Sequence, residues 1–182
     1  MIDELHSLGF KVMLWLVPCM SPDSYTFRQA RNDEIFYKNK NDDNVKIMEW
    51  WDGFSAVLDF TNPKAKEWLK KQCDNLQSKY GVDGFKFDGA DDCFYPYDGK
   101  FFKDMPRIHQ QRLYSEFASN YLLNEMRACF NTQGKGLAQR LTDKAHSWDN
   151  RGLNTLIPNG IAMSILGYRY CCPDMIGGGL VG

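Results

Sequence analysis

The segment GVDGFKFDG, at residues 81–89, decides how this chain is expected to fold. Side chains alternate between the two faces of a β-strand. One face of this segment therefore carries Phe85 and Phe87, and the other carries Lys86 and Asp88. Glycines bound the segment on both sides, which is typical of a short strand between turns. We expect a strand whose charged face ends on Asp88.

Strands and helices are expected to alternate on both sides of this segment. Residues 11–18, KVMLWLVP, are almost continuously apolar, which is typical of a strand buried in a parallel sheet. A helix is expected to begin at Asn62, a favourable N-cap, and Pro63, and to end at Gly81. The other expected elements are helices at 108–129 and 152–166, a strand at 135–141, and a last strand with a Gly-rich turn within 166–179. Residues 19–58 are interpreted as a long irregular loop.

This alternation predicts an α/β fold with a parallel sheet. A complete (β/α)8 barrel needs about 250 residues and eight strands, whereas the chain has 182 residues. The sequence offers about four βα units with parallel strands, whereas a whole barrel has eight. We therefore expect a partial (β/α)8 TIM barrel. Residues 1–182 would form a single, incomplete catalytic barrel domain, and a small open α/β sheet is the alternative. Residues 1–10 are typical of the end of an amphipathic helix closed by Gly9, so missing barrel strands are expected from flanking sequence.

The overall composition argues against several kinds of partner. The formal net charge of -1 gives no reason to expect a nucleic-acid partner. No apolar run approaches the roughly 20 residues of a membrane span. The six cysteines form no CxxC pair and the three histidines show no metal-ligand spacing, so we expect neither a metal site nor a cofactor. The aromatic content of 14% suits core packing or stacking against sugar rings.

Ionisable side chains gather at the end of the strand expected at 81–89. Asp88 ends the strand, and Lys86 shares its face. Asp91 and Asp92 follow on the next turn, and charges this close change one another's protonation. In parallel α/β folds the working residues collect at the carboxyl ends of the strands. The group is therefore a candidate site, and the alternative is a charge pair that caps the strand.

Glycoside hydrolysis needs two carboxyl groups on opposite sides of one bond. A second carboxyl group is expected after the strand at 135–141, where residues 142–152 read TDKAHSWDNRG. The candidates are Asp149 and Asp143. Trp148 is expected to form an apolar wall that raises the pKa of Asp149, as a general acid requires. The alternative is a loop aspartate that binds its own backbone.

Residues 81–91, GVDGFKFDGAD, resemble the nucleophile motif of glycoside hydrolase family 31, written DGF-W-x-D-M-N-E. Asp88 matches the nucleophile. Lys86 replaces the usual Trp and Asp91 the usual Glu, as in the KFD-type branch of the family. Three further segments resemble family landmarks in the same order: residues 5–18, 50–68 and 166–179. The resemblance spans nearly the whole chain.

The resemblance implies a retaining α-glycosidase that hydrolyses O-glycosyl bonds of α-glucosides or α-galactosides by double displacement, with a carbohydrate substrate and no cofactor. Asp88 would be the nucleophile, kept ionised with the help of Lys86, and Asp149 the acid/base, at roughly 5–5.5 Å in a complete barrel. Asp143 stays as the alternative acid, because Asp149 directly follows Trp148, whereas the family pattern R-x-x-x-W-x-G-D-N separates the two. The residues matching substrate-binding positions are Trp51, Lys86, Asp91, Arg140, Trp148 and Asp174.

Two other functions remain open at this stage. A Schiff-base aldolase or lyase would use Lys86 as its covalent residue in an apolar barrel. The second alternative is an inactive barrel fragment with a sugar-binding or structural role. Inactivity is considered because the exposed edge strands of an incomplete barrel favour instability and self-association.

Overall fold

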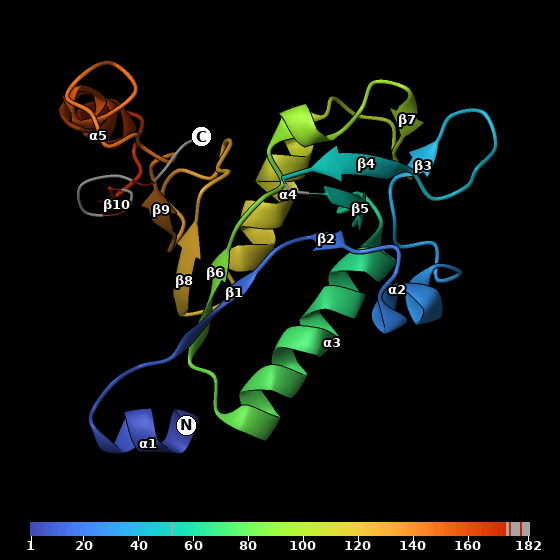
Figure 1. Cartoon of the computed structure of the whole chain (residues 1–182), viewed down its shortest axis with the longest axis horizontal. Helices are drawn as coiled ribbons and strands as arrows, with labels where there is room; N and C mark the ends of the chain where they lie inside the picture. Colours follow the sequence, from blue (N-terminus) through green and yellow to red (C-terminus); the bar gives the residue numbers. More distant parts are fainter. Residues whose placement is uncertain (52, 174, 176–178, 180–182) are drawn as a thin grey trace.

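The computed structural model describes residues 1–51, 53–173, 175 and 179. Within these residues a parallel sheet has the strand order β1-β6-β8-β9-β10 (Figure 1). Its strands are β1 (Met13–Leu16), β6 (Gly84–Phe87), β8 (Leu123–Met126), β9 (Ala138–Arg140) and β10 (Tyr170–Cys172). The helices are α1 (Ile2–Ser7), α2 (Tyr25–Ala30), α3 (Pro63–Tyr80), α4 (Ile108–Ala118) and α5 (Leu156–Ile165), with 3-10 turns η1 (Asp92–Phe94) and η2 (Leu153–Thr155).

The order of the parallel strands follows the order of the chain, as it does in a (β/α)8 barrel. Helix α4 joins β6 to β8, and α5 joins β9 to β10. The predicted partial barrel is therefore confirmed, with one parallel strand more than expected. The predicted strands at 11–18, 81–89, 135–141 and 166–179 correspond to β1, β6, β9 and β10.

The two faces of the sheet have different surroundings. Phe85 and Phe87 of β6 are fully buried in one apolar cluster with Leu69 of α3 and Phe117 of α4. Helix α3 runs alongside β1 and β6 (Figure 1). The opposite face carries the polar side chains of β6 and Trp15 of β1, a residue that is 49% exposed. The site is expected on this second, open face.

The start and end of α3 follow the predicted signals. The Asn62 side chain accepts a hydrogen bond from the Lys64 backbone N–H at 3.0 Å, and Pro63 is the first helical residue. Gly81 ends the helix with a left-handed φ of 72°. Gly9 adopts the same conformation after α1, with φ of 84°. These local predictions are confirmed.

The predicted helix at 108–129 is wrong in its second half. Helix α4 ends at Ala118, and Asn120 donates through Nδ2 to two carbonyls of its last turn, at 2.9 and 3.1 Å. Strand β8 follows within a few residues. The apolar spacing is misleading because Tyr121 continues it and is buried, yet lies beyond the helix. The side-chain cap, rather than the apolar pattern, terminates α4.

The interpretation of residues 19–58 as an irregular loop is also wrong for much of the segment. It contains helix α2 and the strands β2 (Cys19–Met20), β3 (Lys38–Asn39), β4 (Ile47–Trp50) and β5 (Gly53–Val57). Strands β2, β5 and β4 form an antiparallel sheet, and β3 pairs with β7 (Gly99–Lys100). These strands are too short for an alternating pattern to stand out. Their folding holds Trp51 near the end of β1.

Candidate active site

Asp88 lies at the carboxyl end of β6, where the chain makes a sharp turn. Its backbone N–H donates to the Leu16 carbonyl at 2.8 Å, which extends the pairing of β6 with β1. Gly89 and Ala90 then adopt left-handed φ values of 70° and 64°. A residue with a Cβ is strained in this region by roughly 1–3 kcal/mol, and Ala90 is buried. The turn therefore fixes Asp88 at the rim of the sheet.

Four neighbours surround the Asp88 carboxylate. Trp15 Nε1 donates to Oδ2 at 3.0 Å, and the Gly89 N–H donates to Oδ1 at 3.0 Å. Arg127 Nε lies 3.2 Å and Arg140 Nη2 3.6 Å from Oδ1. Burial raises the pKa of Asp88, but the Trp15 hydrogen bond and the two guanidinium charges outweigh it, so the pKa lies below its ordinary value. The carboxylate is ionised at neutral pH, as a nucleophile requires.

Lys86 lies on the same face as Asp88, as predicted, but its ion pair is with another carboxylate. Lys86 pairs in register with Glu125 of β8, and its Nζ lies 3.5 Å from Glu125 Oε1. Arg140 Nε lies 3.2 Å from the same oxygen. The main counter-charges of Asp88 are therefore Arg127 and Arg140 rather than Lys86.

Asp91 is held close to Asp88 by a shared arginine. Arg127 Nη2 donates to Asp91 Oδ2 at 2.5 Å. Burial raises the pKa of Asp91 above its ordinary value in spite of the Arg127 charge. Two neighbouring carboxyl groups thus have pKa values shifted in opposite directions, which is a feature of functional sites.

The structure brings Asp143 into the same cluster. Arg140 Nη1 donates to Asp143 Oδ1 at 2.7 Å, and Arg127 Nη1 lies 4.0 Å from the same atom. Both arginines also approach Asp88. Asp143 is therefore connected to the predicted nucleophile through two side chains.

Asp149 is bonded within its own loop. Its Oδ1 accepts from Ser147 Oγ at 2.7 Å and from the Arg151 N–H at 2.9 Å. These hydrogen bonds lower the pKa of Asp149 below its ordinary value. The predicted elevation by Trp148 is therefore wrong in this arrangement, because Trp148 is 84% exposed and the local donors favour the charged form.

Trp51 lies next to the cluster through contact with a second tryptophan. Its ring centroid is 6.3 Å from that of Trp15, the residue bonded to Asp88. Trp51 is 72% exposed, so the face of its ring is accessible for stacking. Asp174, the last predicted substrate-binding residue, lies outside the described residues.

Sequence reasoning missed three members of the cluster: Trp15, Glu125 and Arg127. Trp15 belongs to an apolar run in which nothing marks one residue as polar-facing. Glu125 and Arg127 were hidden inside the predicted helix at 108–129. If β8 is placed correctly, alternation puts both on the face of Lys86, and Arg127 follows the carboxyl end of the strand.

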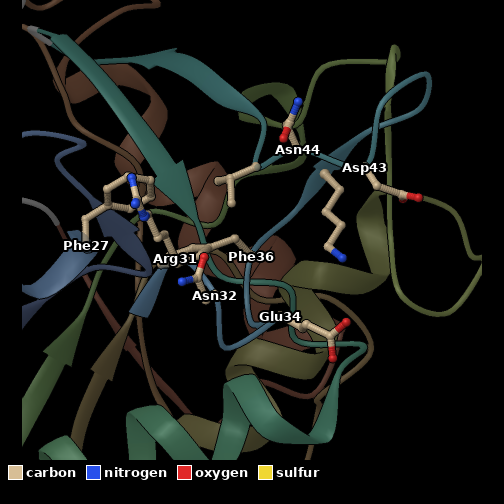
Figure 2. Close-up of a pocket in the computed structure, with 9 residues that line it drawn as sticks. Phe27, Arg31, Asn32, Glu34, Phe36, Asp43 and Asn44 are labelled. Carbon is tan, nitrogen blue, oxygen red and sulfur yellow. The ribbon is translucent and has the colours of Figure 1, made fainter. Parts of the chain in front are cut away.

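A separate polar pocket of about 490 Å³ lies between α2 and the segments around β3 (Figure 2). Its labelled lining includes Arg31, Glu34 and Asp43. Among the described residues, none of the predicted site residues lines it. Across all the residues that the structure describes, no group of three or more His, Cys, Asp or Glu side chains is placed to hold a metal ion.

The family model described as the glycosyl hydrolases family 31 TIM-barrel domain matches residues 1–178. The chain belongs to glycoside hydrolase family 31. One relative in this comparison, the myogenesis-regulating glycosidase of Mus musculus, is 34% identical over 185 residues, which cover 100% of this chain and 26% of that protein. The alpha-xylosidase XylQ of Lactiplantibacillus pentosus is 32% identical over 90 residues, 48% of this chain and 11% of the enzyme.

Solved structures of the family share this fold. A sulfoquinovosidase of family 31 from E. rectale superposes with a TM-score of 0.89 at 19% identity, over 100% of this chain and 29% of that one. The cycloalternan-degrading enzyme from Trueperella pyogenes superposes with a TM-score of 0.83 at 20% identity, over 99% and 28%. The chain thus spans between a quarter and a third of these two solved chains.

Family membership favours glycosidase chemistry over the aldolase alternative, for which the matching proteins offer no support. Among the described residues, no helix has the length and apolar character needed to cross a membrane.

Proposed function

We propose that this chain supplies the nucleophile and the acid/base of a retaining α-glycosidase. The observation that carries the proposal is the position of Asp88 at the carboxyl end of β6, on the open face of the sheet, where Arg127 and Arg140 lie 3.2 and 3.6 Å from its Oδ1. In TIM-barrel enzymes this end of the strands holds the active site. Membership of family 31 supports the same assignment.

The proposed reaction has two steps. In the first, an Asp88 oxygen forms a bond to the anomeric carbon while the bond to the leaving oxygen breaks, and a carboxylic acid gives that oxygen a proton. In the second, the same residue, now a carboxylate, takes a proton from water as the water oxygen attacks the anomeric carbon. The bond to Asp88 breaks and its carboxylate is restored.

The acid/base is proposed to be Asp149 or Asp143, both in the loop after β9. Family resemblance favours Asp149, which would have to leave its bonds to Ser147 and Arg151 to act as an acid. Connection to the cluster favours Asp143, because Arg140 binds it and also approaches Asp88. The two assignments make different predictions for the variants described below.

The proposed substrates are neutral α-glucosides or α-galactosides. Each cation of the cluster has a carboxylate partner within the chain: Lys86 has Glu125, Arg127 has Asp91, and Arg140 has Asp143. No cation of this group is left to bind a charged substituent of the sugar. Trp51 would stack on the apolar face of the sugar ring.

Covalent trapping tests the nucleophile. The protein, at the full length in which it occurs in its source, is incubated with 2-deoxy-2-fluoro α-glucosyl and α-galactosyl fluorides, and the labelled peptide is identified by mass spectrometry. We expect one sugar on Asp88 and no labelling of Asp88→Asn. Labelling of a different carboxylate would refute the assignment. Reduction of a carbonyl substrate onto Lys86 by borohydride would instead support the aldolase.

Leaving-group dependence tests the acid/base. Loss of the acid slows substrates with poor leaving groups more than nitrophenyl glycosides, and azide restores turnover because it needs no base. We compare Asp149→Ala with Asp143→Ala in the same protein. The true acid/base shows both effects, and its activity on natural disaccharides falls by about 100-fold or more. If neither variant shows them, the acid/base lies elsewhere in the protein.

A further inference from the structure

Arg127 occupies a central place in the cluster that neither the nucleophile motif nor the predicted site residues account for. It follows β8 directly, and its side chain is 19% exposed. Each of its three nitrogens faces a different carboxylate. Nε lies 3.2 Å from Asp88, Nη2 2.5 Å from Asp91, and Nη1 4.0 Å from Asp143.

These carboxylates come from two different loops. Asp88 and Asp91 follow β6, whereas Asp143 follows β9. Arg127 therefore links the loops after three neighbouring strands of the sheet. A planar guanidinium holds such partners in fixed directions, which a lysine ammonium cannot do.

Arg127 also makes the two oxygens of Asp88 different. Oδ1 faces Arg127 and Arg140 and accepts from the Gly89 N–H. Oδ2 accepts only the neutral Trp15 N–H among the hydrogen bonds in the described part of the chain. The Arg127 Nε–H is buried and makes no hydrogen bond within the described residues, although Oδ1 is 3.2 Å away. A small rotation of the carboxylate would complete this bond.

We propose that Arg127 is a positioning residue for the reaction of Asp88: it anchors Oδ1, keeps the carboxylate charged, and leaves Oδ2 to attack the sugar. This inference rests on the proposed function. Asp91 contributes to this positioning, because its hydrogen bond with Arg127 Nη2 fixes the plane of the guanidinium group. The cations facing Asp88 are then Arg127, directly after β8, and Arg140 of β9. Asp91 on its own segment adds a neighbouring negative charge, and Lys86 beside it is paired with Glu125 of β8.

The variants Arg127→Gln and Arg127→Lys test this role in the full-length protein. Arg28→Gln is the control, because it removes the same charge from an exposed position on α2. Carbon-13 NMR of labelled aspartate carboxyls, assigned with Asp88→Asn, gives the pKa of Asp88 whether or not the protein is active. We expect this pKa to rise by about one unit or more in Arg127→Gln, which loses an adjacent opposite charge, and to stay unchanged in Arg28→Gln.

Kinetics give the second measurement. In Arg127→Gln we expect trapping by the fluoroglycoside to slow by about 10- to 100-fold and the acid limb of kcat/KM to move to higher pH. Compared with Arg127→Gln, Arg127→Lys should restore the position of the acid limb but only part of the trapping rate. Lysine returns the positive charge but not the planar guanidinium group that holds the carboxylates in fixed directions. An unchanged pKa of Asp88 in a folded Arg127→Gln variant would overturn the inference. Failure of the parent protein to be trapped would count against the proposed function alone, since the titration does not need turnover.

Discussion

At the scale of single residues, the site depends on how charge is distributed around Asp88 and Asp91. The two carboxyl groups share Arg127, yet burial dominates at Asp91 while donors and cations dominate at Asp88. Asp88 has two neutral donors, the Trp15 indole and the Gly89 N–H, and two guanidinium groups, whereas Asp91 has one cation and a neighbouring negative charge. This difference separates the charged carboxylate of Asp88, the proposed nucleophile, from a carboxyl group that is easier to protonate.

Trp15→Phe isolates the neutral side-chain donor to Asp88. The change keeps an aromatic ring beside Trp51 but removes the hydrogen bond to Asp88 Oδ2. The pKa of Asp88 should rise, because a hydrogen bond to the charged form lowers it. A hydrogen bond to a charged group is worth about 1.5–3 kcal/mol, so kcat/KM on the acid side of the profile should fall about tenfold or more.

The sign of the stability effect follows from the same shift. A carboxyl group with a depressed pKa stabilises the folded state above its unfolded pKa, and this contribution is lost as the pH falls through the folded pKa. Trp15→Phe should therefore unfold at a lower temperature than the parent at pH 7 and approach it at low pH. Trp68→Phe, on α3, is the control and should leave the pH profile unchanged. A Trp15→Phe profile that matches the parent would show that the donor is dispensable.

Residue types alone predicted part of this site. The chain itself brings Lys86, Asp88 and Asp91 close together, so their proximity could be predicted without knowledge of the fold. Glu125 lies in β8 and Arg127 directly after it, in a segment whose apolar spacing predicts a helix. Only the sheet register places Glu125 opposite Lys86. The hydrogen bonds of Asp149 within its loop depend on backbone geometry that no spacing encodes.

At the scale of elements, β6 is the part of the fold that aims the site. It pairs with β1 on one side and β8 on the other, so its neighbours supply Trp15 and Arg127. The close pairing with β8 depends on Gly84. A Cβ added there would lie 1.9 Å from the Leu123 carbonyl oxygen. This contact requires the backbones of the two strands to move apart.

Gly84→Ala should therefore destabilise the sheet and displace β8 from β6. Overpacking of this kind costs roughly 1–3 kcal/mol, so we expect a lower thermal midpoint and slower trapping of Asp88 by the fluoroglycoside. Gly136→Ala is the matched control, because nothing lies within 4 Å of a Cβ at that position. Equal unfolding midpoints for the two variants would show that the pairing of β6 and β8 tolerates a side chain.

Element prediction succeeded where local chemistry is decisive and failed where tertiary contacts decide. The caps at Asn62 and Gly81 fixed α3 without reference to the rest of the molecule. The end of α4 depended on Asn120, which the apolar spacing of Tyr121 concealed. The short strands of residues 19–58 are stable only because they pair with one another and with Gly99–Lys100.

At the scale of the whole molecule, the described sheet is an arc of a barrel with two edges, β1 and β10. Its open face carries the charged cluster as well as Trp15. Helix α5 has no buried residue, and its apolar side chains Ile157 and Ile165 are 75% and 80% exposed. Exposed apolar helices and unpaired strand edges favour association with other chains.

We therefore expect residues 1–182, expressed alone, to self-associate, to bind a hydrophobic dye, and to leave nitrophenyl α-glycosides unhydrolysed. Light scattering after size exclusion measures the association, and the full-length protein is the comparison. The double variant Ile157→Lys/Ile165→Lys of the isolated chain should reduce association, because both residues are exposed on α5. The control is Phe10→Lys, at an exposed position on a different segment, and it should reduce association less. A monomer that hydrolyses these substrates, and loses the activity in Asp88→Asn, would show that five parallel strands suffice to aim the nucleophile.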